Sequence, residues 1–157
     1  MKTATVTQLK NELKERQPSE LLDICLTLAK FKKENKELLT YILFESEDEH
    51  GYIQSIKEEV DIAFETINTR NFYYIKKSVR KILKSIKTYI RYSKKKETEV
   101  ELLLYFCKKM QDEIPYMDRS KVITGIYDRQ LEMAVKRISL LHEDLQYDYN
   151  LEVEELR

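Results

Sequence analysis

Glycine, proline and tryptophan are scarce in this sequence, whose 157 residues include two Gly, two Pro and no Trp. A sheet of many strands needs turn-forming residues between its strands, so this scarcity argues against a β-rich fold. It also excludes the glycine-rich loops that hold phosphates in nucleotide-binding folds, since neither GxGxxG nor GxxxxGK occurs. With 42% hydrophobic and 36% charged residues, the composition is typical of a folded domain in water. We therefore expect an all-α protein, with residues 1–157 forming a single domain.

Long hydrophobic runs are also missing. The longest stretches without a charged residue have about seven residues, for example Leu38–Phe44, whereas a membrane-spanning helix needs roughly 20 apolar residues. The first residues, MKTATVTQLK, lack the apolar core of a secretory signal. We therefore expect no transmembrane segment and a cytoplasmic location.

Only two cysteines occur, Cys25 and Cys107, and they lie far apart in the sequence. Each is surrounded by apolar residues at helical spacing, which predicts two buried thiols in a reducing compartment. No CxxC motif and no Cys/His spacing typical of zinc sites is present.

The two histidines give little support for a metal site or for catalysis. Glu47 and His50 form one Glu-x-x-His pair, but a di-metal helical bundle needs two such pairs, and Ser139 stands three residues before His142. No Gly-x-Ser-x-Gly nucleophile motif occurs. We therefore predict no catalytic residue, no metal ligand and no cofactor, and we do not expect an enzyme.

Helix caps and hydrophobic periodicity predict seven helical segments, of which the last six are substantial. A capping box at Thr5–Gln8 opens the first segment, and Pro18 suits the first position of the second. Further capping boxes at 46–49 and 98–101 mark the starts of the fourth and sixth segments, and the sixth must end just before Pro115. Short connections force neighbouring helices to run antiparallel, which gives a bundle or a short stack of helical hairpins with about six main helices.

The last part of the chain is predicted to form one long helix and an acidic tail. Apolar residues at three- and four-residue spacing continue from Ile123 to Leu145, and the helix begins after Asp118 or Ser120. For the tail, about residues 148–157, two alternatives stay open: it is disordered, or it folds back on a basic helix earlier in the chain. Residues 1–4 are also expected to lie outside the ordered domain.

Three stretches near the N-terminus carry a resemblance to known helical proteins: Leu9-Lys10 with Leu13, Pro18–Leu22 continuing to Ala29-Lys30, and Glu34–Leu39. This N-terminal segment resembles an uncharacterised bacterial family of small all-helical proteins of unknown function. The same segment is similar to a helical-hairpin repeat of the HEAT type. The resemblance implies a helical fold and nothing about activity.

Charge is distributed unevenly along the chain, although 28 basic residues balance 28 acidic ones. Residues 1–65 hold nine Lys and Arg against 14 Asp and Glu, and residues 97–157 hold eight against 14. Residues 66–96 hold 11 basic residues and no acidic one. The neutral total therefore conceals one strongly cationic segment between two acidic ones.

A helical projection of the cationic segment separates an apolar face from a basic face. Ile75, Val79 and Ile86 lie on the apolar face, which we expect to be buried. Like charges four residues apart destabilise a helix by a few tenths of a kcal/mol per pair, so the apolar face must hold this helix in place. Lys77 and Lys81 widen the other face. We define the basic face by seven residues: Lys76, Arg80, Lys84, Lys87, Arg91, Lys94 and Lys95.

Three kinds of neighbour are compatible with the basic face. The first is water or the chain's own acids in 58–65 and 97–101, which would form exposed ion pairs worth about 0–1 kcal/mol each. The second is nucleic acid, whose phosphates would be neutralised with release of counterions, while Tyr73 and Tyr92 lie near enough to stack on unpaired bases. The third is an acidic protein surface or an anionic lipid.

The sequence thus predicts a non-enzymatic binding or scaffolding module that uses its basic face. The alternative is sequence-nonspecific binding of nucleic acid, through contacts of the basic helix 72–96 with the phosphate backbone. The partner predicted is therefore an acidic protein surface or nucleic acid, and the sequence defines no oligomeric state.

Overall fold

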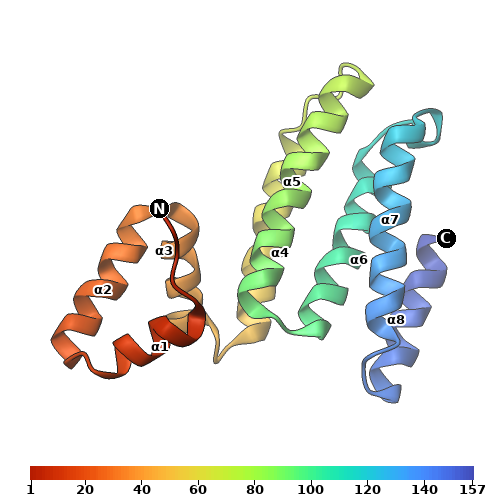
Figure 1. Ribbon diagram of the computed structural model, residues 1–157. Coiled ribbons are helices and arrows are strands. Elements are labelled where there is room, and N and C mark those ends of the chain that lie inside the picture. Colours follow the sequence, from red (N-terminus) through yellow and green to blue (C-terminus); the bar gives the residue numbers. More distant parts are fainter. The chain divides into compact units, whose positions relative to one another are not determined.

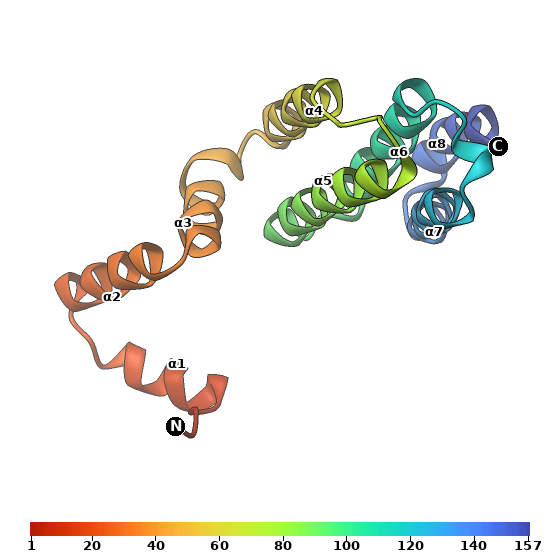
Figure 2. The same cartoon turned by 90° about the horizontal axis from the view of Figure 1, so that it is seen from above.

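The computed structural model describes all 157 residues, and every regular element in it is helical. Figures 1 and 2 show the helices in two views. The prediction of an all-α fold is confirmed, although there are eight α-helices instead of about six. The elements are α1 (Val6–Lys14), α2 (Pro18–Phe31), α3 (Lys33–Thr40), a π-helical turn (Tyr41–Glu45), α4 (Glu49–Glu65), α5 (Phe72–Ser93), α6 (Lys96–Glu113), a 3-10 turn (Met117–Arg119), α7 (Lys121–Ile138) and α8 (Glu143–Leu156).

The chain divides into two compact units, residues 1–44 and residues 45–157, within the span predicted as one domain. None of the helices is both long enough and apolar enough to cross a lipid bilayer.

The first unit contains α1, α2 and α3. The predicted capping box of α1 is confirmed, because the Gln8 N–H donates to Thr5 Oγ1 at 3.3 Å while Gln8 Oε1 accepts the Thr5 N–H at 2.9 Å. Pro18 opens α2 as predicted. Ala29 and Tyr41 are the only buried apolar residues in this unit, so it has very little apolar core.

The second unit is built around α6, which packs against α4, α5, α7 and α8 (Figure 1). The sequence of α6 explains this central position, because apolar residues occupy several of its faces, at 102–104 and again at 106–107. Phe106, Cys107 and Met110 have no exposed surface. The helix ends at Glu113, before the proline that was predicted to stop it.

The capping box predicted at 46–49 is wrong. Helix α4 is capped by Asp48, whose Oδ1 accepts the N–H of Gly51 at 3.0 Å. The Asp48 carboxylate accepts a hydrogen bond from one of the free amide groups in the first turn of the helix. The predicted box had given this role to Ser46, two residues earlier.

The capping box predicted at 98–101 is also wrong, because α6 begins at Lys96 and has no side-chain cap. Thr98 is buried, and its hydroxyl donates to Glu49 Oε1 at 2.7 Å. The Thr98 side chain, which the local pattern had predicted as a cap, thus forms a hydrogen bond between α6 and α4.

The single long helix predicted up to Leu145 is wrong, since the chain breaks between α7 and α8. Helix α7 ends at Ile138, and His142 caps α8 by accepting the Asp144 N–H on Nδ1 at 3.3 Å. The apolar spacing continues across this break, so periodicity alone does not reveal it.

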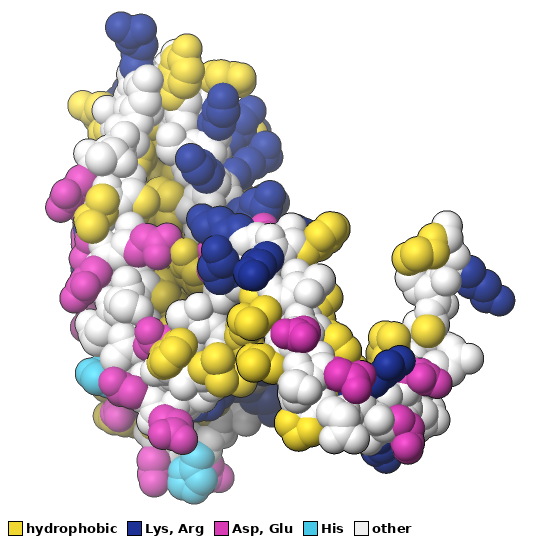
Figure 3. All heavy atoms as spheres, turned by 90° about the vertical axis from the view of Figure 1, so that its left-hand side faces the viewer, with side chains coloured by type: hydrophobic (Ala, Val, Ile, Leu, Met, Phe, Trp, Pro, Cys, Tyr) yellow, Lys and Arg dark blue, Asp and Glu magenta, His cyan; other side chains and the backbone are white.

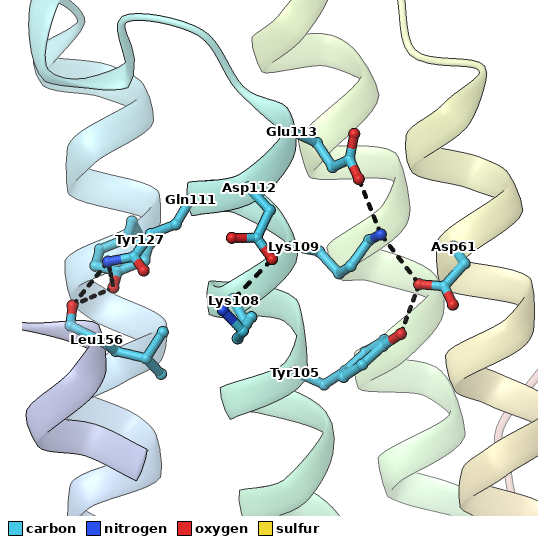
Figure 4. Close-up of polar contacts among 9 residues, drawn as sticks. All are labelled: Asp61, Tyr105, Lys108, Lys109, Gln111, Asp112, Glu113, Tyr127 and Leu156. Atoms are coloured by element: carbon cyan, nitrogen blue, oxygen red, sulfur yellow. Dashed lines mark hydrogen bonds and ion pairs between the residues drawn. The ribbon is translucent and has the colours of Figure 1, made fainter.

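The acidic C-terminal tail is helical and packs against α6 and α7. Tyr149 and Leu156 are buried. Figure 4 shows the last carbonyl of α8, that of Leu156, accepting hydrogen bonds from the Tyr127 hydroxyl and from Gln111 Nε2, the latter at 3.0 Å. These bonds satisfy a carbonyl that has no partner within its own helix.

The two cysteines lie in different environments. Cys107 is buried in α6, where burial raises the pKa of its thiol to about 12. Cys25 is exposed on α2, so the prediction of two buried thiols is wrong for this residue. The reason is that the apolar stripe of α2 stays largely uncovered, with Leu22 and Leu28 exposed as well.

Candidate anion-binding face

Helix α5 has 22 residues and carries five of the seven residues of the basic face. The basic helix predicted over 72–96 is wrong at its end, because α5 stops at Ser93, Lys94 is left-handed with φ 60°, and Lys95 is the N-cap residue of α6. Helix α5 begins at Asn71, whose Oδ1 accepts the Tyr74 N–H at 3.2 Å. Its apolar face packs into the core as predicted, and Ile75, Val79 and Ile86 are at most 2% exposed. This packing fixes the rotation of α5 about its own axis, and therefore fixes the direction in which its opposite side chains point.

Most of the basic face is open to solvent. Lys77 and Lys81, which widen it, are also exposed. In the upper part of Figure 3, Lys and Arg side chains gather along one side of the surface, while acidic side chains lie mainly along the opposite side and lower down. The exposed members of the basic face are Arg80, Lys84, Arg91, Lys94 and Lys95, and the half-buried ones are Lys76 and Lys87.

Within the second unit, only one residue of the basic face forms an ion pair. Lys95 Nζ lies 3.3 Å from Glu49 Oε2. Glu49 also accepts hydrogen bonds from the buried hydroxyls of Ser93 and Thr98, so it joins α4 to the end of α5 and the start of α6. The other six members of the basic face have no carboxylate oxygen within 4.0 Å.

Of the acids that flank α5 in the sequence, Asp61, Glu99 and Glu101 form ion pairs with helices other than α5. Glu59 bonds to α5 itself, but to the Tyr89 hydroxyl at 2.7 Å and not to the basic face. Figure 4 shows Asp61 Oδ1 accepting the Tyr105 hydroxyl at 2.6 Å and lying 3.3 Å from Lys109 Nζ. Helix α6 carries bases and acids that face α4 and α7, so these three helices neutralise one another. The remaining pairs of this kind are Glu101 with Lys57 at 2.7 Å and Glu99 with Arg137 at 2.8 Å.

Two pKa shifts accompany the contact between α4 and α6. Burial lowers the pKa of Lys109, but its hydrogen bonds to Glu113 and Asp61 outweigh burial and raise the pKa above its usual value. Burial and the hydrogen bond to Asp61 raise the pKa of Tyr105 to about 12. Asp61 thus bonds to two side chains of α6 and to none of the basic face.

The two tyrosines predicted near the basic face behave differently. Tyr73 is 60% exposed, and Lys76 Nζ lies 5.5 Å from its ring centroid, within the range of a cation–π contact. Tyr92 is half-buried, and its ring centroid lies 6.2 Å from that of Tyr89. Only Tyr73 therefore offers a largely open aromatic ring beside the cations.

A groove between α4 and α5 was missed by sequence reasoning. It has a volume of about 320 Å³ and runs beside the basic face, with Lys81 on its rim. The groove exists because Ala63 of α4 and Ser78 and Ser85 of α5 are small where the helices face each other. These small residues are a signal only once the pairing of the two helices is known.

The histidines and acids considered for a metal site do not come together. His50 is exposed, and His142 serves as the cap of α8. No group of three or more His, Cys, Asp or Glu side chains is arranged to hold a metal ion. The basic face and the neighbouring groove are thus the features of this unit from which a function can be argued.

No protein-family model, no curated protein and no solved structure matches the chain. The resemblance of the N-terminal segment to a helical family therefore finds no counterpart in these comparisons.

Proposed function

We propose that this protein is a non-enzymatic helical binding module whose basic face binds the phosphate backbone of nucleic acid without reading its sequence. One observation carries the proposal: six of the seven basic side chains have no carboxylate partner in their own unit, although acids flank α5 on both sides in the sequence. A cationic surface of this kind attracts a polyanion and gains free energy from the counterions that it releases.

The length of the basic face suits a nucleic-acid strand. From Lys76 to Arg91 its helical part extends about 22 Å at the rise of an α-helix, which equals roughly six phosphates along one strand of DNA. Phosphate contacts need cations at suitable intervals and no particular base, so lysine and arginine side chains on a straight helix are sufficient. An acidic protein surface is the competing partner, because it offers the same sign of charge.

The test is a fluorescence-anisotropy titration of the full-length protein with labelled 20-nucleotide DNA, single-stranded and duplex, at about 50 mM to 300 mM salt. With six phosphate contacts, the logarithm of the affinity for duplex should fall with the logarithm of salt at a slope of roughly −5. The triple variant Lys84→Glu, Lys87→Glu, Arg91→Glu should lose binding while keeping its helix content. Its fold should survive, because the change relieves repulsion between like charges along α5.

A matched control separates this face from the effect of net charge. The triple variant Lys121→Glu, Arg129→Glu, Lys136→Glu changes the charge of the protein by the same amount, at exposed residues of α7 that form no ion pair. It should bind within about threefold of the wild type, since long-range effects are screened beyond roughly 10 Å at 0.1 M salt. Absence of binding at about 50 mM salt, or equal loss in both variants, rejects the proposal. Equally tight binding of polyglutamate would reassign the face to an acidic protein.

A further inference from the structure

The groove between α4 and α5 has the size and lining of a site for a flat, partly apolar ligand. Its volume of about 320 Å³ lies at the lower end of the roughly 300–1,000 Å³ that small-molecule sites occupy. Val60, Ile82 and Ile86 form a buried apolar floor. The walls of the groove include Ala63 and Thr66 from the α4 side and Ser78, Lys81 and Ser85 from α5. At one end the Tyr89 hydroxyl of α5 donates to Glu59 Oε1 of α4 at 2.7 Å.

Polar groups at the edge of the groove are available to a ligand. The half-buried Ser78 hydroxyl makes no hydrogen bond within the protein, and Lys81 Nζ has no carboxylate partner. The Thr66 hydroxyl donates to backbone carbonyls of its own helix and keeps its lone pairs free to accept. An apolar floor with separate donors and acceptors at its rim matches the faces and edges of a nucleobase.

The groove and the basic face run side by side along the same helix. Ser78, Lys81 and Ser85 follow one another at three- and four-residue spacing on the side of α5 that adjoins the basic face. From Ser78 to Tyr89 the groove-lining side extends about 16 Å. A strand whose phosphates lie on the basic face therefore has its bases within reach of the groove.

We propose that the protein binds single-stranded nucleic acid, with the phosphates on the basic face and unpaired bases entering the groove between α4 and α5. This inference rests on the proposed function and adds the class of ligand. The bases of a duplex are paired and stacked, so a duplex can use the phosphate contacts alone. The exposed ring of Tyr73 lies beside Lys76 and offers one more surface on which an unpaired base can stack.

The experiment compares three labelled 20-mers that carry the same number of phosphates per strand: a single strand of thymidines, the same strand with abasic sites throughout, and a duplex. The full-length wild type should bind the thymidine strand about tenfold more tightly than the abasic strand, which lies in the range expected for one stacked base. Equal affinity for the thymidine and abasic strands, with duplex bound equally well, would overturn the inference and leave the proposed function intact. No binding to any of the three would reject the proposed function itself.

Variants that fill the groove test its location. Ala63→Phe places an aromatic ring in the groove and should remove the preference for the thymidine strand, while its affinity for duplex changes by less than about twofold. The matched control is Ile62→Phe, at a residue of the same helix that is 63% exposed and does not line the groove. If Ala63→Phe does not fold, Ser85→Leu on the opposite wall fills the same space. A groove-filling variant that folds and keeps the full preference for the thymidine strand would overturn the inference.

The same variants separate nucleobases from lipid as the occupant of the groove. Vesicles of phosphatidylserine and phosphatidylcholine provide anionic headgroups and apolar chains without bases. Their headgroups can occupy the basic face, so the inference predicts that any competition with the thymidine strand at about 100 mM salt is equal in Ala63→Phe and Ile62→Phe. Competition by vesicles that is lost in Ala63→Phe and kept in Ile62→Phe would assign the groove to acyl chains and overturn the inference.

Discussion

The two glycines of the chain both lie inside helices, but the space around them differs. A Cβ atom on Gly51 would lie 2.3 Å from Oδ2 of Asp48, the residue that caps α4. A Cβ atom on Gly125 would have Arg129 Nη1 at 3.6 Å as its nearest neighbour, which is an ordinary contact. Replacing a helical glycine by alanine usually raises the free energy of unfolding, and this gain is therefore expected only at Gly125.

We predict opposite effects for the two alanine substitutions. Gly125→Ala should raise the free energy of unfolding by about 0.5–1 kcal/mol, because alanine restricts the unfolded chain and favours the helix. Gly51→Ala should lower it by about 1 kcal/mol, because the Asp48 carboxylate must leave its capping position. Urea unfolding followed by circular dichroism measures both values. As a control, Gly51→Ala should no longer destabilise the protein when Asp48 is already replaced by alanine. If both glycine substitutions stabilise the wild type equally, the proposed role of the Asp48 cap is contradicted.

Single residues show which local patterns predict structure and which do not. The pattern around Thr5 predicted its cap correctly, because no other helix competes for the side chain. The same pattern around Thr98 failed, since the hydroxyl donates to Glu49 from a distant part of the sequence. Cys25 was predicted to be buried from its apolar neighbours, but periodicity says which side of a helix is apolar and does not say what covers that side.

At the level of whole helices, the two faces of α5 could be predicted and its surroundings could not. Helical periodicity separates apolar from basic residues within one segment, so the buried positions of Ile75 and Val79 follow from the sequence. The pairing of Asp61 with Lys109 depends on α4 packing against α6, which short-range patterns do not specify. The groove was missed for the same reason, because it needs α4 and α5 together.

Two tyrosines at helix contacts, Tyr105 between α6 and α4 and Tyr127 between α7 and α8, lead us to predict a loss of stability at alkaline pH. Burial raises the pKa of Tyr127 to about 12, and burial with the bond to Asp61 raises that of Tyr105 to about 12. Tyrosine in an unfolded chain ionises near pH 10. Because the pKa is higher in the folded state, each phenol contributes its full stability below about pH 10 and loses it as the pH rises towards 12. The free energy of unfolding in urea should therefore fall steeply above about pH 10.

A pair of tyrosine variants assigns this alkaline loss to particular contacts. Tyr127→Phe should lower stability by about 1–2 kcal/mol at pH 7, since the Leu156 carbonyl and Gln111 lose a buried partner. It should also flatten the fall above pH 10. Tyr147→Phe, at a residue that is 68% exposed, should change neither value. Identical alkaline profiles for the wild type and Tyr127→Phe would contradict the assignment.

Across the whole molecule, the two units differ in how much apolar surface they bury. Every buried apolar residue except Ala29 and Tyr41 belongs to residues 45–157. Residues 1–44 instead leave large side chains such as Leu22, Phe31 and Phe44 exposed. Chains of about 40 residues rarely fold alone without disulfides, metals or a partner. The sequence pattern did not reveal this difference, because both parts contain amphipathic helices with similar spacing.

We therefore predict that residues 45–157 fold on their own and that residues 1–44 do not. The longer fragment should unfold in a single cooperative urea transition, because it contains nearly the whole buried core. The shorter fragment should lose its helical circular dichroism signal gradually, because isolated helices of fewer than about 15 residues are marginal in water. Cooperative unfolding of residues 1–44, or an unfolded fragment 45–157, would contradict the prediction. Residues 45–157 contain the whole basic face and the groove, so the fragment keeps every proposed binding contact. Its dissociation constant for the single-stranded 20-mer should therefore lie within about threefold of that of the full chain.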